Sequence, residues 1–309
     1  MLRRPLLALS GSQRFKHLVT TAPISRGVVA RFVAGEGVDD AVRTARTLVA
    51  DGLLVSLDHL GEDTTDSGQA DATTKAYLTL LSRLADAGLT SGTEVSVKLS
   101  AVGQALPGDG ERIATDNAAR ICETARSAGT TVTLDMEEHH TVDSTLAILR
   151  ELRGDFPDVG GVLQTYLRRT VDDCCELAGE GSRIRLCKGA YDAPPDVAFE
   201  SRVGTDKSYV RCLEVLMSGQ GYPMIATHDP RLIGIAGALA ARHGRAQGSY
   251  EYQMLYGVRP DEQRRLAREG EKVRIYTPYG DEWYAYLMRR MAERPANTAF
   301  FLRSVLSKR

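Results

Sequence analysis

The 309-residue sequence lacks the features of several protein classes. It holds only five cysteines, an odd number, and none of them forms a C-x-x-C pair. This usage argues against a disulfide framework and against a cysteine-based zinc site, and it fits a reducing compartment such as the cytoplasm. The five are Cys122, Cys174, Cys175, Cys187 and Cys212.

An excess of charge of one sign is also missing, because 39 Lys and Arg oppose 40 Asp and Glu. We therefore expect no nucleic-acid partner. The apolar run that follows Arg3 and Arg4 is too short for a signal peptide or a membrane span, and we interpret it as a frayed leader. No Pro- or Ser-rich linker divides the chain, which favours a single domain with a large core.

Short β-like runs alternate with stretches of helical periodicity. Eight such runs over roughly 250 residues predict an α/β fold of the (β/α)8 type, with residues 1–50 as an N-terminal helical segment and 51–309 as the barrel. A doubly wound sheet is the alternative. The predicted strands are Leu53–Leu60, Glu94–Ser100, Thr131–Glu137, Gly160–Tyr166, Arg183–Ala190, Met224–Asp229, Tyr250–Leu255 and Val273–Tyr279. Helices are predicted at Thr73–Ala87, Ile113–Ala128, Val142–Leu152 and Arg231–Ala241.

Polar residues recur on one side of the predicted strands. Alternate residues of a strand face opposite sides, so the apolar positions would face the helices and the polar ones the barrel interior. Inward charges are costly unless they are paired or bind a ligand, and a structural ion network is the alternative to a site. The inward set is Lys98, Asp135, Gln164, Arg185 and Tyr276.

A second polar stripe lies near the end of the sequence. Tyr286, Arg289, Arg290 and Glu293 are spaced i, i+3, i+4 and i+7, which places them on one face of a helix. Two adjacent guanidiniums suit a carboxylate or a phosphate, because each can donate two parallel hydrogen bonds. A solvated basic face is the alternative for this helix taken alone.

Together these segments resemble the proline dehydrogenase family, in the same order over about residues 30 to 305. The matching segments are Val95–Ser100, Leu134–Glu137, Gln164–Arg169, Arg185–Tyr191, Ala226–His228, Tyr252–Gly257, Arg274–Gly280 and Tyr286–Asn297.

The resemblance implies a distorted (β/α)8 TIM-type barrel that binds FAD without a covalent bond. It implies oxidation of L-proline to 1-pyrroline-5-carboxylate by hydride transfer to FAD, the first step of proline catabolism to glutamate. Electrons would pass to a membrane quinone, and a separate pyrroline-5-carboxylate dehydrogenase would act next, since no residues remain for such a module. We expect a cytoplasmic enzyme, peripheral at most at the inner face of the membrane. Residues 299–309 could make that contact, but packing of this segment in the core is the favoured alternative.

The resemblance also assigns roles to residues. Lys98, Arg289 and Arg290 would bind the substrate carboxylate, and Leu255, Tyr276 and Tyr286 would surround its ring. Asp135, Arg185 and Tyr276 form the expected catalytic set, in which Asp135 anchors the wall and Arg185 lies by the flavin N5. Glu62 would close the site by pairing with Arg289. The expected cofactor residues are Met136, Gln164, Lys188, Gly189, Ala190, Thr227, His228 and Glu293.

Three positions depart from the family pattern. Cys187 replaces valine and should matter little to folding. Asp192 stands where tryptophan is frequent. Asp229 replaces asparagine after Thr227-His228, and its charge would weaken FAD binding if it pointed inward, so we expect it to face away.

Other functions remain open at this point. A bulky Tyr286 favours proline over 4-hydroxyproline, whose dehydrogenases carry a small residue there. Lys98 or Lys188 could instead serve a Schiff-base aldolase on the same barrel. A metal site at 137–140 is disfavoured because adjacent histidines do not share a face, so we predict no metal. A binding module that uses Arg289 and Arg290 is a further alternative.

Overall fold

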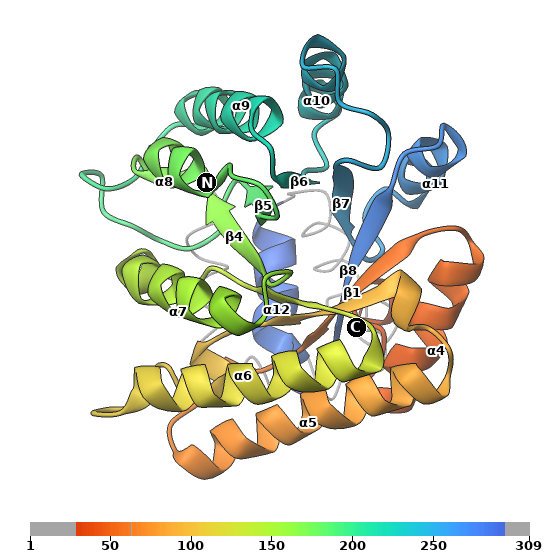
Figure 1. The fold of residues 1–309 in the computed structure, drawn as a ribbon, viewed down its shortest axis with the longest axis vertical. Helices are drawn as coiled ribbons and strands as arrows, with labels where there is room; N and C mark the ends of the chain where they lie inside the picture. The colour runs from red at the N-terminus through yellow and green to blue at the C-terminus, as the bar shows by residue number, and fades with distance from the viewer. Residues whose placement is uncertain (1–28, 63, 294–309) are drawn as a thin grey trace, which may run out of the picture.

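Eight parallel strands close into a barrel in the computed structural model, which describes residues 29–62 and 64–293 (Figure 1). Each strand pairs with the next, and β8 pairs with β1, so the predicted barrel is confirmed and the doubly wound alternative is wrong. The strands are β1 (Leu54–His59), β2 (Thr93–Val97), β3 (Val132–Leu134), β4 (Gly160–Gln164), β5 (Arg183–Cys187), β6 (Tyr222–Ala226), β7 (Glu251–Leu255) and β8 (Val273–Tyr279).

An α-helix follows every strand, and one precedes β1. The helices are α4 (Val38–Ala50), α5 (Ser67–Asp86), α6 (Gly110–Ala128), α7 (Val142–Asp155), α8 (Thr170–Leu177), α9 (Arg202–Ser218), α10 (Pro230–Arg242), α11 (Pro260–Arg268) and α12 (Trp283–Glu293). Short 3-10 turns lie at Thr90–Gly92, Ser100–Val102 and His139–Thr141.

The barrel is distorted at the point where it closes. Helix α4 packs against β1 and β8 and fills the place in the outer ring where a helix after β8 would lie. Helix α12 leaves the ring and is seen through the middle of the barrel in Figure 1. Its apolar side packs with Phe32, Val33 and Leu60 in a second core cluster, apart from the main core. Since Leu60 follows β1, α12 covers the carboxyl-terminal end of the barrel.

Local sequence explains these elements. In β2 all five residues are buried, with Val95 and Val97 in the core between sheet and helices. Ser96, the polar residue between them, faces the interior and donates a hydrogen bond to Asp135. Helix α5 starts where Asp66 accepts a hydrogen bond from the backbone of Gln69, which satisfies an otherwise unpaired amide.

Several predicted strands end earlier than expected. We predicted Glu94–Ser100 and Thr131–Glu137, but the ladders stop at Val97 and Leu134. The chain turns after Lys98, where the amide of Ala101 donates to the Lys98 carbonyl. Side-chain parity gave the inward direction correctly, although Lys98 and Asp135 lie just beyond the ends of their strands. The division into residues 1–50 and 51–309 stays a prediction.

Candidate active site

Arg185 lies at the centre of a buried polar network inside the barrel. It belongs to β5, is 4% exposed, and its guanidinium lies 5.2 Å from the centre of the Tyr276 ring. All five of its N–H donors have acceptors. Nε donates to Gln253 (2.5 Å), Nη1 to Ser96 (2.8 Å) and Asp135 (2.7 Å), and Nη2 to Ser56 (3.2 Å) and Glu94 (3.4 Å).

Asp135 connects Arg185 to the opposite side of the barrel. One carboxylate oxygen accepts from Arg185 and the other from the Tyr276 hydroxyl, each at 2.7 Å. Lys98 lies 3.8 Å from the second oxygen and 3.4 Å from the Tyr276 hydroxyl. The structure thus brings together four residues of the sequence-predicted inward set, as parity required.

Asp58 is a member of this network that sequence analysis missed. It belongs to β1, is fully buried, and its Oδ1 accepts a hydrogen bond of 2.6 Å from Lys98. Burial raises the pKa of Asp58 to about 6, although Lys98 opposes the shift. The same alternation that selected Lys98 places Asp58 and Ser56 on the inward side of β1, so the signal for Asp58 was present in the sequence.

The ion pair with Asp58 bears on the aldolase alternative. Burial alone would lower the pKa of Lys98, but Asp58 and Asp135 outweigh it and the pKa is raised. A Schiff-base lysine must lose its proton to act as a nucleophile. The two acids thus favour the protonated form of Lys98, which disfavours a Schiff-base role and suits the binding of an anion.

Gln164, at the end of β4, has a buried side-chain acceptor without a partner among the described residues. Its side chain is 3% exposed, and its amide nitrogen donates to the Met136 carbonyl at 3.1 Å. Its Oε1 is buried and has no hydrogen-bond partner among the described residues. An unpaired buried acceptor is costly, and a ligand that offers an N–H, as a flavin ring edge does, would satisfy it. The residues at this position therefore fit a flavin.

The loop after β5 approaches the same region. Gly189 has a φ of +90°, and a Cβ atom there would lie 2.2 Å from the Tyr166 ring, so only glycine fits. Together with Lys188 and Ala190, it forms a half-buried segment beside β4 and β6. The contact of this segment with a cofactor stays a prediction.

Lys188 is engaged by two aspartates. Its ammonium group donates to Asp206 at 2.6 Å and lies 3.5 Å from Asp229. Asp229 also caps α10 and pairs with Arg231 at 2.6 Å, and the hydrogen bond from Arg231 lowers its pKa to about 2. The Asp229 carboxylate is therefore held by Arg231 and Lys188. Our expectation that it faces away from a bound cofactor stays a prediction.

Thr227 and His228 form a turn at the end of β6. The Thr227 hydroxyl accepts from the amide of Asp229 at 3.1 Å. The His228 Nε2 accepts from the amide of Leu255 at 2.9 Å, which fixes the ring against β7 and places the proton of a neutral imidazole on Nδ1. Arg259, which sequence analysis missed, donates to the His228 carbonyl at 2.7 Å. These bonds hold the expected cofactor and substrate segments side by side.

Helix α12 carries the expected clamp. Tyr286 is 5% exposed, and the Arg290 guanidinium lies 5.3 Å from the centre of its ring. Burial raises the pKa of Cys187 to about 11, and the nearby Arg290 acts in the opposite direction, so its charge is close to the end of β5. The side chains of Arg289 and Glu293 lie outside the described part of the structure, as do residues 299–309.

Glu137 is a second acid that sequence analysis did not assign. It is 6% exposed, and its carboxylate accepts from the Ser100 hydroxyl (2.6 Å) and the Ser100 amide (3.1 Å). Burial raises its pKa to about 7, and the nearby Glu62 adds to the shift. Glu62 also acts on Lys98, so the predicted gate residue lies near the carboxylate-binding side of the site.

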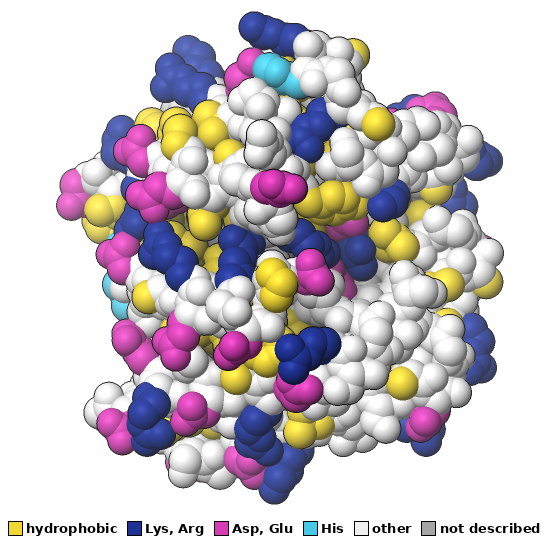
Figure 2. Space-filling model, viewed as in Figure 1, with side chains coloured by type: hydrophobic (Ala, Val, Ile, Leu, Met, Phe, Trp, Pro, Cys, Tyr) yellow, Lys and Arg dark blue, Asp and Glu magenta, His cyan; other side chains and the backbone are white. Residues whose placement is uncertain are grey.

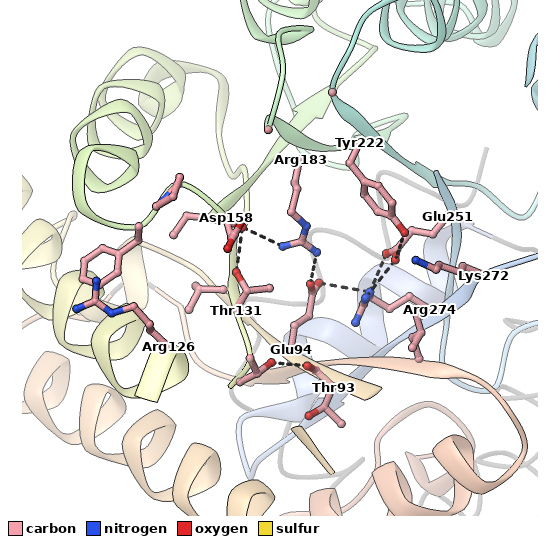
Figure 3. A pocket seen from close by; sticks show the side chains of 18 of the residues that line it. Thr93, Glu94, Arg126, Thr131, Asp158, Arg183, Tyr222, Glu251, Lys272 and Arg274 are labelled. Carbon is pink, nitrogen blue, oxygen red and sulfur yellow. Dashed lines mark hydrogen bonds and ion pairs between the residues drawn. The ribbon is translucent and has the colours of Figure 1, made fainter. Parts of the chain in front are cut away.

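A large hollow lies at the opposite end of the barrel (Figures 2 and 3). Its volume is about 940 Å³, and it is lined by residues at the starts of the strands, among them Glu94, Arg183 and Arg274. Barrel enzymes place their chemistry at the carboxyl ends. In this hollow Arg183 is paired with Glu94, and Arg274 with Glu251. We therefore assign the active site to the other end.

Residues 29–62 and 64–293 contain neither a metal-binding cluster nor a membrane-spanning helix. No group of three or more His, Cys, Asp or Glu side chains there could hold a metal ion. Over the same residues, no helix combines the length and the apolar character needed to cross a bilayer.

The fold and this network define a (β/α)8-barrel enzyme with a charged site at the carboxyl ends of its strands. Residues 41–303 match the family model described as proline dehydrogenase. The chain is 35% identical to proline dehydrogenase 1 of Bacillus subtilis over 308 residues, which cover all of both chains. It is 40% identical to the proline dehydrogenase of Deinococcus radiodurans over 278 residues, 89% of each chain. The chain belongs to the proline dehydrogenase family.

A solved structure supports the fold. Proline utilization A (PutA) from Bdellovibrio bacteriovorus, inactivated by N-propargylglycine, superposes with a TM-score of 0.81 and 23% identity. The match covers 92% of this chain and 34% of that one. The predictions of the family, of an oxidoreductase and of the barrel are thus confirmed, and the family implies a flavin cofactor.

Proposed function

We propose that the protein oxidises L-proline to 1-pyrroline-5-carboxylate with FAD as its cofactor, as the first step of proline catabolism to glutamate. FAD supplies an acceptor for the hydride that leaves the ring carbon next to the proline nitrogen, and it passes the electrons to a membrane quinone. A separate pyrroline-5-carboxylate dehydrogenase would use the product.

One observation carries the proposal. A single hydrogen-bonded network joins Lys98, Tyr276, Asp135 and Arg185 across the carboxyl ends of four strands, beneath the helix that carries Tyr286 and Arg290. Such an arrangement offers cations to a small carboxylate and aromatic surface to a small ring. It holds these groups in fixed positions, and positioning supplies much of the rate of a hydride transfer.

The protein's own residues have three tasks in this proposal. Lys98, Arg289 and Arg290 bind the carboxylate, and their charges orient the ring. Tyr276, Tyr286 and Leu255 pack against the ring and exclude water, and Asp135 fixes the Tyr276 hydroxyl. No proton has to be taken up by these residues if proline binds with a neutral amine.

Arg185, Gln164 and Met136 face the flavin in this proposal, and the ribityl, phosphate and adenine parts would contact the ends of β5 and β6 with Glu293. The cofactor residues there are Lys188, Gly189, Ala190, Thr227 and His228. Because Lys188 already pairs with Asp206 and Asp229, it contributes less net charge to a diphosphate than a free lysine would.

An absorption spectrum tests the function. The purified protein should show the bands of an oxidised flavin, and L-proline should bleach them without oxygen. A flavin-loaded sample that keeps its visible spectrum in saturating L-proline would show that proline is not the substrate.

A further inference from the structure

Glu94 lies directly beneath Arg185 and is fully buried. Its carboxylate accepts from the hydroxyls of Ser56 (3.0 Å) and Thr133 (3.1 Å). It also accepts from Arg183 at 2.7 Å and from Arg185 at 3.4 Å. A carboxylate with this many donors is held in one orientation and holds its partners in turn.

A second path reaches Arg185 from the same carboxylate. The Arg274 Nε lies 3.7 Å from Glu94 and donates to Glu251 at 2.7 Å. Glu251 accepts from the Gln253 amide at 2.6 Å, and Gln253 accepts from the Arg185 Nε at 2.5 Å. The contacts form a closed ring through five side chains. Figure 3 shows Arg183 and Arg274 directed toward Glu94 from two sides of the hollow.

The charges inside the barrel balance. The cations Lys98, Arg183, Arg185 and Arg274 are matched by four acids, Asp58, Glu94, Asp135 and Glu251. Burial alone would raise the pKa of Glu94, but Arg274, Arg183 and Arg185 lower it to about 2. Glu94 is therefore ionised at neutral pH and offsets one full positive charge.

We propose that Glu94 is a positioning residue that fixes the Arg185 guanidinium from below and sets how much positive charge the active site presents to the flavin. The inference rests on the proposed function, since it needs a flavin above Arg185. All five N–H donors of Arg185 are already hydrogen-bonded inside the protein. A bound flavin would therefore interact with the positive charge of Arg185, and it could accept a hydrogen bond only if Arg185 gave up one of its present acceptors. The reduction potential of the flavin would then depend on the orientation of Arg185 and on the net charge of the network.

A change at Glu94 has a definite sign. Glu94→Gln removes one negative charge and leaves the network with a net charge of +1. A more positive surrounding stabilises the electron-rich reduced flavin relative to the oxidised one, so the midpoint potential should rise. A residue with a purely structural role would change stability without this directed shift.

The matched control is Thr133→Val. Thr133, like Ser56, donates to the Glu94 carboxylate, but only Ser56 also accepts from Arg185. The midpoint potential is measured by reductive titration of the flavin-loaded proteins without proline. We expect a higher potential in Glu94→Gln than in the wild type and no change in Thr133→Val. A Glu94→Gln protein that folds, binds flavin and keeps the wild-type potential would overturn the proposal.

A second measurement decides the matter if Glu94→Gln does not fold. Ser56→Ala removes a contact from Arg185 and one from Glu94, whereas Thr133→Val removes only the contact with Glu94. Stopped-flow reduction by proline should be about tenfold slower in Ser56→Ala at saturating proline, with the proline concentration at half-saturation nearly unchanged. Thr133→Val should retain the wild-type rate. Equal losses in both variants would show that holding Arg185 does not matter.

Failure of the proposed function gives a different result. If proline does not reduce the wild-type flavin, the substrate assignment is wrong, and the potentials still test Glu94. If the wild type binds no flavin, both the proposed function and this inference are wrong.

Discussion

The Tyr276 hydroxyl donates a hydrogen bond of 2.7 Å to Asp135, which joins β8 to the end of β3 across the barrel. The same carboxylate accepts from Arg185, so one buried acid holds both an aromatic wall residue and the central cation. Neither contact can be replaced by water without rearrangement, because Asp135 is 8% exposed.

Asp135→Ala should therefore abolish most turnover. It leaves the Tyr276 hydroxyl and an Arg185 N–H unpaired, and a lost hydrogen bond to a charged group costs about 1.5 to 3 kcal/mol. We expect kcat for proline to fall by at least about tenfold to a hundredfold. Asp173→Ala is the control, because Asp173 is also a buried acid bonded to an arginine, Arg169, but lies on α8. Equal kinetic losses in both variants would contradict a specific role for Asp135.

Arg290→Met and Arg289→Met should mainly raise KM for proline. In the proposed function, each substitution removes a charged contact with the carboxylate that forms before the reaction. Its loss would be worth about 1.5 to 3 kcal/mol, or about one to two decades in affinity. Steady-state kinetics with increasing proline measure the effect. Arg150→Met, which removes an exposed guanidinium paired with Glu176, should behave like the wild type. An unchanged KM in both test variants would show that Arg289 and Arg290 do not bind the substrate carboxylate.

Glu62→Ala tests the proposed gate. If Glu62 pairs with Arg289 over bound proline, its loss lets water into the closed site and lowers turnover while the fold survives. Circular dichroism establishes the fold, and kcat establishes the function. Wild-type kinetics in this variant would rule out the gate.

The sequence was sufficient to predict the barrel because its signals are local. Alternating hydrophobicity marks each strand, and parity then shows which residues face inward, as Lys98, Asp135 and Arg185 do in the structure. The departure of α12 from the ring was not predictable from periodicity, because an amphipathic helix fits either place. Only the packing of Leu60 and Phe32 against its apolar side distinguishes them.

The missed residues were missed for a physical reason. Asp58, Glu94 and Glu251 are acids buried by partners far away in sequence, such as Arg183, which is 89 residues from Glu94. The alternation of residues within one strand shows that such an acid faces the interior. It does not show which cationic side chain from another strand will pair with it. Asp229 illustrates the same limit, since its contact with Lys188 depends on how two separate loops meet.

Glu137 should give the protein a pH-dependent stability. Burial raises its folded-state pKa from 4.5 to about 7, so the folded protein binds this proton more tightly than the unfolded chain. The associated stability is present below about pH 4.5 and is lost as the pH rises through 7, up to about 3 kcal/mol by linkage. Urea unfolding of wild type and Glu137→Gln at pH 4.5 and 7.5 measures it. The decline should be smaller in the variant, and parallel declines would refute the assignment.

The last prediction concerns the choice between proline and 4-hydroxyproline. Tyr286 is 5% exposed, and its ring lies beside the Arg290 guanidinium, which is proposed to bind the substrate carboxylate. An added hydroxyl on the substrate would meet this aromatic surface without a partner. We expect a higher kcat/KM for L-proline than for 4-hydroxyproline. Tyr286→Ser should reduce this difference between the two substrates by about 1 to 3 kcal/mol in transition-state free energy, the range for one small group in a shaped pocket. The narrowing should combine a loss of efficiency with proline and a relief of the clash with hydroxyproline. Measurement of kcat/KM for both substrates in both proteins decides the point, and an unchanged ratio would mean that Tyr286 does not line the ring pocket.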